Sequence, residues 1–369
     1  MKLYKKHISD LGKVITGKTP RTSILENYGG KIPFLTPSDN LSEKFSPTTS
    51  KTLTKIGLNE VKNCLLPSKS ICVSCIGSDL GKVVLTKKPT VTNQQFNSIV
   101  PNEENDADFI YYLMTVVGKH LNYLSKTSTA VPIINKSTFA NYEIEIPNIK
   151  EQKRIGKILS SLDDKIELNR RINDNLEQQA QALFNEMFPH ITEGENMIGD
   201  LIMPKRGKGL LSKNAIKGDI PVVAGGIEPA TYHNQANTTA PVLTIAASGA
   251  NAGYINLWHI PVWASDSSYI DNSITPNVYF WYIMLKKRQK EIFDAQVGSA
   301  QPHIYPKHIA ELPMNVVFVE KIAEYNEIVT PIFEKKGQLY LESKRLTSLR
   351  DTLLPKLMSG ELKINDINN

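Results

Sequence analysis

The chain contains one sequence pattern twice. Residues 109–188 align with residues 279–358 at a constant offset of 170 residues, without a gap. Aromatic, alanine and proline positions keep this register, with Phe109-Ile110-Tyr111-Tyr112 on Tyr279-Phe280-Trp281-Tyr282 and Thr129-Ala130-Val131-Pro132 on Ser299-Ala300-Gln301-Pro302. Because chance rarely preserves one offset over such a length, we expect two copies of one structural unit.

The repeat extends upstream with shifted offsets. Three further segments match, namely Ile8-Ser9-Asp10-Leu11 with Ile198-Gly199-Asp200-Leu201, Gly30-Lys31-Ile32-Pro33 with Gly218-Asp219-Ile220-Pro221, and Ile76-Gly77-Ser78-Asp79-Leu80-Gly81 with Ser248-Gly249-Ala250-Asn251-Ala252-Gly253. The first parts of the two copies therefore share a framework but differ in loop length, as diverging recognition loops would.

Each copy divides into a turn-rich globular part and a long charged helix. Short β-prone runs separated by Gly, Pro and Asn predict strands at residues 31–35, 70–76, 82–85 and 142–146. A helix is predicted from about Asp106 to Leu124. Its stripe of Phe109, Tyr112 and Leu113 favours core packing over base stacking.

Residues 151–188 contain no proline and predict one long helix with a heptad stripe. The pairing positions are Ile155, Leu162, Asn169, Leu176 and Leu183, and those of the second copy are Tyr325, Ile332, Leu339, Leu346 and Leu353. An intramolecular antiparallel pair would bury both stripes, and Asn169 would fix the register if it meets a polar neighbour. In the second copy the helix is expected to start near Pro331 or to bend there.

These patterns predict an α+β fold of two tandem mixed α/β domains and two long helices. The helices would pack as an antiparallel coiled coil with pseudo-twofold symmetry. A chain of 369 residues with 41% hydrophobic and 22% charged residues is long enough for such domains. The net charge of +6 lies in the first half, which suits nucleic acid but also other partners.

Targeting signals and cysteine chemistry are not indicated. The lysine-rich N-terminus and the lack of an 18-residue apolar run favour a cytoplasmic protein with no membrane contact. Cys72 and Cys75 have the spacing of a redox or metal pair. They lie in an apolar run where the second copy has Thr244 and Ala247, so we expect buried structural thiols.

The sequence lacks the familiar catalytic motifs. The chain lacks a Gly-rich cofactor loop and an Asn-Pro-Pro-aromatic motif, and residues 77–82 do not fit a phosphate loop. The histidines show no metal-ligand spacing. Asp163-Asp164 is expected to be a solvated helix face. These observations favour a protein without catalysis, bound metal or cofactor.

The order of motifs along the whole chain resembles the specificity subunit of type I DNA restriction-modification complexes. The resemblance rests on the tandem arrangement and on four sets of residues, namely Gly17-Lys18-Thr19-Pro20 followed by Gly30-Lys31-Ile32-Pro33, the Ser/Thr-Ala-x-Pro-x-Ile segments, Glu151-Gln152-Lys153-Arg154-Ile155, and Leu353-Leu354-Pro355-Lys356-Leu357-Met358-Ser359-Gly360-Glu361-Leu362. The second helix departs from it, since Glu320-Lys321-Ile322 lacks the glutamine found at Gln152.

The resemblance implies target recognition domains at residues 1–147 and 191–317, and spacer helices at 148–190 and 318–369. Each domain would read one half of a bipartite site in double-stranded DNA, and the helices would set the gap. Two methyltransferase subunits, which use S-adenosylmethionine, would dock on the helices. Restriction subunits using ATP and Mg²⁺ could join, and this chain itself would be non-catalytic.

Base reading requires donors and acceptors on protruding loops. In the first domain the candidates are Lys18, Thr19, Arg21, Asn93, Gln94, Gln95, Lys126, Thr127 and Ser128. In the second they are Lys205, Arg206, Lys208, Asp266, Ser267, Ser268, Ser299, Gln301 and His303. Two other interpretations stay open, namely a coiled-coil scaffold that binds proteins through two diverged modules, and a methyltransferase without familiar motifs.

Overall fold

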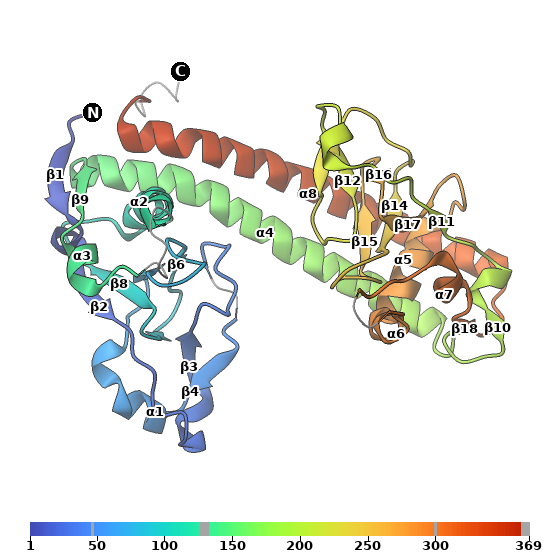
Figure 1. Cartoon of the computed structure of the whole chain (residues 1–369), viewed down its shortest axis with the longest axis horizontal. Coiled ribbons are helices and arrows are strands. Elements are labelled where there is room, and N and C mark those ends of the chain that lie inside the picture. The colour runs from blue at the N-terminus through green and yellow to red at the C-terminus, as the bar shows by residue number, and fades with distance from the viewer. Residues whose placement is uncertain (46–47, 126–132, 299–300, 363–369) are drawn as a thin grey trace. The chain divides into compact units, whose positions relative to one another are not determined.

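The computed structural model describes residues 1–45, 48–125, 133–298 and 301–362 (Figure 1). The chain divides into two compact units. Unit 1 comprises residues 1–167 and 344–369, and unit 2 comprises residues 168–343. Two long helices, α4 (Ile149–Met187) and α8 (Val319–Ser359), each contribute one part to each unit.

Unit 1 contains three small sheets. The antiparallel four-stranded sheet has the order β2 (Gly12–Thr16), β8 (Phe96–Pro101), β5 (Ile71–Ser74), β6 (Val83–Leu85). The three-stranded sheet has the order β4 (Lys51–Leu53), β3 (Tyr28–Leu35), β7 (Val91–Thr92), and β3 and β7 are parallel. β1 (Tyr4–His7) pairs with β9 (Glu143–Ile146). The short helices are α1 (Lys55–Glu60), α2 (Ala107–Ser125) and α3 (Lys136–Ala140).

Unit 2 repeats this topology. Its four-stranded sheet has the order β11 (Lys205–Arg206), β17 (Ser267–Asp271), β14 (Val242–Ala246), β15 (Ile255–Trp258). Its three-stranded sheet has the order β13 (Thr231–His233), β12 (Ile220–Val223), β16 (Trp263–Ala264), and β12 and β16 are parallel. β10 (Asn196–Met197) pairs with β18 (Pro313–Met314). The helices are α5 (Val278–Lys287), α6 (Gln289–Asp294) and α7 (Pro306–Ala310).

Strand register confirms the internal repeat. Ser74 lies opposite Phe96, and in unit 2 Ala246 lies opposite Ser267 in the same place. Counting along these strands makes Cys72 equivalent to Thr244. Cys72 and Cys75 are buried, and burial raises the pKa of their thiols to about 12 and about 11. They are therefore structural, unreactive thiols, as predicted.

In each unit the core lies between the four-stranded sheet and the long helices. In unit 1, Phe109 and Met114 of α2 pack in one cluster with Ile71 of β5 and with Ile155 of α4 and Leu357 of α8. Phe109 and Tyr112 of α2 are therefore core residues, as predicted.

Unit 2 encloses its equivalent helix more completely. Every residue of α5 from Val278 to Leu285 is buried, which is the composition expected of a helix covered on all sides. Phe184 of α4 contacts Phe280 of α5 and Tyr325 of α8, with ring centroids 5.5 Å apart in both pairs.

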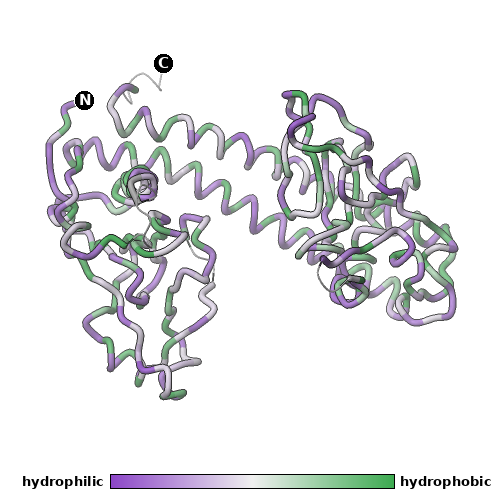
Figure 2. The backbone as a smooth tube through the Cα atoms, viewed as in Figure 1, coloured by the Kyte–Doolittle hydropathy of each residue, from purple (hydrophilic) through white to green (hydrophobic). Residues whose placement is uncertain are grey.

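The long helices alternate hydrophilic and hydrophobic residues along their length (Figure 2). In unit 2 their segments run antiparallel, because Tyr325 donates to the Ala180 carbonyl whereas Asn169, earlier in α4, donates to Glu342, later in α8. In unit 1 Arg350 of α8 donates to Asp163 of α4. Asn169 is buried and donates to Glu342 and Ser343, at 2.8 and 3.3 Å.

The pairing residues predicted from the heptad are not equally buried. Ile155, Asn169 and Leu339 are buried, whereas Leu162, Leu176, Leu183, Ile332, Leu346 and Leu353 are half-buried. In α8 the neighbours Phe333 and Leu354 are buried instead. The long helices pack against α2 in unit 1 and α5 in unit 2 as well as against each other, so their buried stripe is wider than that of a two-helix coiled coil.

The structure contradicts a start of the second helix near Pro331 and a solvated Asp163. α8 begins at Val319 and continues through Pro331. Pro331 is exposed, while Val329 and Phe333 beside it are buried and hold the helix in place. Asp163 is not solvated either, because it is buried and accepts hydrogen bonds from Tyr112 and Arg350.

Candidate nucleic-acid interface

The same backbone frame holds a Gly-Lys pair in both units. The Gly17 amide donates to Phe96 and the Lys18 amide to Thr92, at 3.1 and 2.9 Å. In unit 2 the Gly207 amide donates to Ser267 and the Lys208 amide to Ala264, at 2.8 and 2.9 Å. Lys18 and Lys208 are thus equivalent, and both are exposed.

Glycine is required at this position because the chain passes so close to the neighbouring loop. A Cβ atom on Gly17 would lie 2.2 Å from the Asn93 carbonyl oxygen, and one on Gly207 would lie 2.5 Å from the Ala264 carbonyl oxygen. The sequence analysis did not pair these residues, although the shared Gly-Lys dipeptide was a visible signal. The frame places an exposed ammonium group at the same strand end in each unit.

In unit 1 the loop beside Lys18 carries amides. Thr19 donates to the Gln94 side-chain carbonyl at 2.7 Å, and Asn93 donates to the Gln95 side-chain carbonyl at 2.8 Å. Gln94 is exposed, whereas Asn93 is 8% exposed. The structure therefore brings four predicted residues together around Lys18, with Gln94 the most accessible amide.

Arg21 lies further along the same loop and is paired with α1. Its backbone amide and its Nε donate to the Glu60 carboxylate at 2.9 and 3.2 Å. The backbone hydrogen bond from Arg21 is the main reason why the pKa of Glu60 is lowered. Most of the Arg21 side chain is exposed, so its other nitrogen atoms face solvent.

In unit 2 the corresponding place carries an arginine–carboxylate pair. Arg206 Nη2 lies 2.6 Å from Asp266 Oδ1, and the Ser248 hydroxyl donates to Asp266 Oδ2. The backbone of Ser248 forms a bridge with His303, whose ring stacks on Tyr305 at 5.9 Å. Lys205 and Lys208 on either side of Arg206 are exposed. A guanidinium flanked by two ammonium groups suits a phosphate backbone and base edges.

Several predicted DNA contacts do not lie on exposed loops. Ser267 and Ser268 are 0% and 1% exposed within β17, so their placement on a protruding loop was wrong. Four of the five residues of β17 are buried, so this strand is covered on both faces and its sequence shows no alternation of polar and apolar residues. Gln301 is exposed and His303 half-buried. Lys126, Thr127, Ser128 and Ser299 lie outside the described residues.

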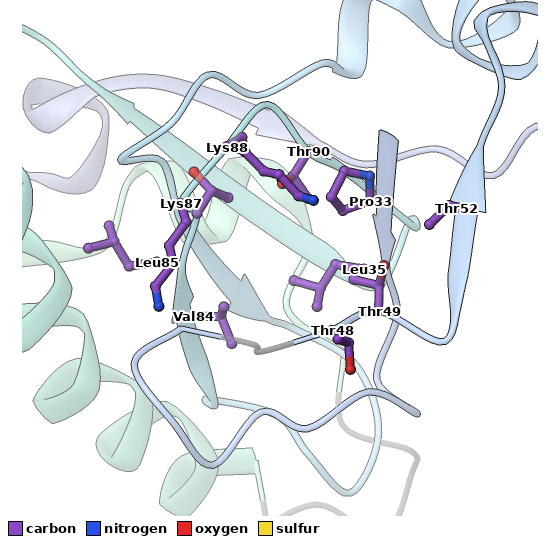
Figure 3. A pocket seen from close by; sticks show the side chains of 11 residues that line it. Pro33, Leu35, Thr48, Thr49, Thr52, Val84, Leu85, Lys87, Lys88 and Thr90 are labelled. Carbon is purple, nitrogen blue, oxygen red and sulfur yellow. The ribbon is translucent and has the colours of Figure 1, made fainter. Parts of the chain in front are cut away.

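Unit 1 also contains a pocket of about 400 Å³ beside its sheets (Figure 3). The described lining residues are Pro33, Leu35, Thr48, Thr49, Thr52, Val84, Leu85, Thr86, Lys87, Lys88 and Thr90. This lining contains no acid, histidine or cysteine. The Lys87 ammonium lies 4.4 Å from the centre of the Phe45 ring. Hydroxyl and ammonium groups suit an anion, and they offer no pair for acid–base catalysis.

The described residues form neither a metal site nor a membrane-spanning helix. No group of three or more His, Cys, Asp or Glu side chains there could hold a metal ion. No described helix is long and apolar enough to cross a bilayer.

Comparisons with known proteins agree with the repeat and the fold. A family model of the type I restriction modification DNA specificity domain matches residues 2–178. The type I restriction enzyme MjaIX specificity subunit of Methanocaldococcus jannaschii is 26% identical over 407 residues, which cover 98% of this chain and 94% of that protein. The HindI specificity subunit of Haemophilus influenzae is 38% identical over 176 residues, 46% of this chain and 38% of that protein.

A solved structure shows the same fold. The S subunit of a type I restriction-modification system from M. genitalium matches with a TM-score of 0.62 and 23% sequence identity. The match covers 97% of this chain and 96% of that chain. The fold is thus shared over nearly the whole length of both chains.

Proposed function

We propose that this chain is the DNA-recognition subunit of a type I restriction-modification complex, because the specificity-domain family model matches residues 2–178 and a type I specificity subunit of Methanocaldococcus jannaschii is similar to it over 98% of its length. Unit 1 and unit 2 would each read one half of a bipartite site in double-stranded DNA. One observation carries this proposal. The same Gly-Lys frame recurs in both units, but the polar groups around it differ, as two readers of different sequences require.

The two exposed lysines of the frame would contact phosphates. Lys18 and Lys208 occupy equivalent places, and a phosphate contact needs the same geometry in both half-sites whatever the bases are. Arg21 and Gln94 of unit 1 and Lys205 and Gln301 of unit 2 are exposed and would extend the contact. The recognition domains would be residues 1–147 and 191–317.

The long helices would set the length of unread DNA and carry the other subunits. α4 and α8 are unbroken over 39 and 41 residues, and each takes part in both units. Two methyltransferase subunits would dock on residues 148–190 and 318–369 and on the surfaces beside them. Those subunits would bind S-adenosylmethionine, and restriction subunits with ATP and Mg²⁺ could join. This chain would contribute no catalytic group.

Methylation mapping tests the proposal. Genomic DNA from cells that express this chain with its modification subunit is sequenced by a long-read method that detects methylated adenine. Cells that express the modification subunit alone are the control. A new bipartite motif that depends on this chain supports the proposal. If a stoichiometric complex produces no motif, the proposal fails and a protein-binding scaffold becomes the better account.

Salt dependence tests the phosphate contacts separately. Replacing Lys18 or Lys208 by Ala should reduce the slope of log affinity against log salt by about one for each residue. Lys290→Ala is a matched control, because Lys290 is 89% exposed and paired with Asp294 on α6. Equal slopes for the wild type and for both frame variants would show that these lysines do not contact phosphates.

A further inference from the structure

We infer that Arg206 reads a guanine in the half-site bound by unit 2, and that Asp266 is the residue that positions it. This inference rests on the proposed function, and it assigns a base and a half-site to one side chain. It starts from the geometry of β11. Arg206 is the last residue of that strand and immediately precedes the Gly-Lys frame.

Asp266 holds the guanidinium by one edge. Arg206 Nη2 donates to Asp266 Oδ1 at 2.6 Å, and the two side chains are 40% and 38% exposed. Within the described part of the chain no other group accepts a hydrogen bond from this guanidinium. Its remaining N–H donors are thus available to a ligand. Arginine presents such donors as a planar fork that fits the O6 and N7 acceptors of guanine in the major groove.

The carboxylate is itself fixed in place. The Ser248 hydroxyl donates to Asp266 Oδ2, and the Asp266 backbone carbonyl accepts from the Ala247 amide at 3.1 Å. Both carboxylate oxygens are therefore used, so Asp266 cannot turn away from Arg206 without losing a second contact. A pre-oriented guanidinium loses less conformational freedom when it meets a base, which raises discrimination at that base.

Unit 1 lacks this arrangement at the equivalent place. Strand register makes Thr16 the counterpart of Arg206, and the backbone hydrogen bond from Cys75 makes Gln95 the counterpart of Asp266. Thr16 donates to Asn97 at 2.7 Å, and the nearby side chains of Asn93, Gln94 and Gln95 are amides. Amides pair with adenine edges. The guanine contact of Arg206 thus has no counterpart at the equivalent place in unit 1.

The experiment uses the full chain in complex with its modification subunit. Once the methylation motif is known, each guanine of the second half-site is replaced in turn by 7-deazaguanine, which lacks the N7 acceptor. Binding of each duplex is measured at fixed salt. For the wild type we expect one position to lose about 10-fold in affinity or more, within the range for an arginine–guanine pair. For Arg206→Ala the loss at that position should vanish.

Three further variants separate reading from folding. Arg206→Lys keeps the charge without the fork and should also lose discrimination at that guanine. Asp266→Asn should reduce it in part, because the guanidinium is no longer held by a charge. Lys290→Ala should keep the wild-type profile.

The outcomes separate the inference from the proposed function. If Arg206→Ala retains the wild-type loss at every guanine, or if the effect maps to the first half-site, the inference is wrong while the function stands. A second half-site without guanine also refutes it. If the wild type produces no bipartite motif, the proposed function fails first.

Discussion

Unit 1 and unit 2 each fix one helix, α2 and α5 respectively, to the long helices through a tyrosine, a carboxylate and a cation. The carboxylates and cations lie at positions that differ between the two copies. In unit 1, Tyr112 of α2 donates to Asp163 of α4, and Arg350 of α8 donates to the same carboxylate at 2.6 Å. Lys44 Nζ lies 3.5 Å from the Tyr112 hydroxyl and 2.5 Å from Asp108. A pocket of about 330 Å³ adjoins this cluster.

In unit 2, Tyr282 of α5 donates to Glu177 of α4 at 2.9 Å, and Lys336 of α8 pairs with that carboxylate. Burial is the main cause that raises the pKa of both Tyr112 and Tyr282, and the adjacent carboxylate adds to it. Both tyrosines therefore stay protonated and act as hydrogen-bond donors at neutral pH.

Only the tyrosines correspond in the repeat. Under the offset of 170, α4 in unit 1 is equivalent to α8 in unit 2, so strict duplication would move the carboxylate to α8. Instead both carboxylates lie on α4 and both cations on α8. Each buried tyrosine thus donates to a carboxylate that is also paired with a cation. The carboxylate and the cation come from helix positions that do not correspond in the two copies.

A second difference concerns the residue that follows β6 in unit 1 and β15 in unit 2 and contacts a long helix. In unit 1, Lys87 lies 3.9 Å from Glu167 of α4, and about half of the lysine side chain is exposed. In unit 2 the equivalent residue is His259, whose ring packs on Gly337 of α8. Burial, with help from Lys336, lowers the pKa of His259 to about 4. One copy uses a solvated ion pair where the other uses a half-buried imidazole that is neutral at pH 7.

The largest expected effect comes from removing a carboxylate. Asp163→Ala would leave Tyr112 and Arg350 without their shared acceptor, and should lower the free energy of unfolding of unit 1 by about 2–4 kcal/mol. Glu177→Ala should do the same in unit 2. Hydrogen exchange of α2 and α5 during urea unfolding distinguishes the units. Asp164→Ala, at the exposed neighbouring position, is the control and should change little; equal effects of the two aspartate variants would refute the role of the cluster.

The next effect is a pH dependence confined to unit 2. Because the pKa of His259 is lower in the folded state than its ordinary value of 6.5, the unfolded chain binds a proton first as pH falls. Stability should thus be lost between about pH 6.5 and pH 4, by about 1–3 kcal/mol. The three tryptophans, Trp258, Trp263 and Trp281, all lie in unit 2, so fluorescence-detected urea unfolding reports it. His259→Phe should flatten this dependence, and an unchanged slope would exclude His259 as the cause.

The next loss of stability is expected at the N-termini of α2 and α5, where a side chain of a long helix accepts hydrogen bonds from backbone amides. Buried Gln152 accepts from the Asp106 amide at 3.0 Å and donates to Asn105 and Pro147. Asn326 accepts from the Tyr279 and Phe280 amides at 3.1 and 3.3 Å. Gln152→Ala should therefore cost about 1–3 kcal/mol and Asn326→Ala about 1 kcal/mol, measured by hydrogen exchange in α2 and α5. The reverse order would contradict the greater burial of Gln152.

The smallest effect is expected at Lys87. Its ammonium is distant from Glu167 and partly exposed, so Lys87→Ala should change the free energy of unfolding of unit 1 by less than about 0.5 kcal/mol. Urea unfolding followed by far-UV circular dichroism measures it. A cost above 1 kcal/mol would show that Lys87 stabilises unit 1 through its contact with the Phe45 ring as well.

The sequence predicted the elements of the fold because their signals are local. Strands at 71–74, 83–85 and 143–146 and the helix at 107–125 lie where periodicity placed them. It did not predict that Asp163 is buried, because that depends on Arg350, nearly two hundred residues away. Nor did it show that Pro331 lies within a helix, since packing of Val329 and Phe333 overrides a local preference.

The candidate interface was predicted only in part. Lys18, Gln94, Arg206 and Lys208 lie exposed around a common frame, because Gly-Lys and polar loop signals are short-range. Ser267 and Ser268 look like loop residues by composition, yet hydrogen-bonded neighbours on β11 and β14 bury them. The pairing of Arg206 with Asp266 joins segments sixty residues apart, and no local pattern encodes it.

The division of α4 and α8 between the units has a consequence for synthesis. Unit 1 contains residues 1–167 but also needs Leu354, Leu357 and Met358 of α8 in its core. A ribosome makes these residues only after all of unit 2 has been synthesised. Unit 2, whose segments are contiguous, can therefore complete its core first, while the domain begun earliest waits with an open apolar face. The part of the chain translated first is the last to finish folding.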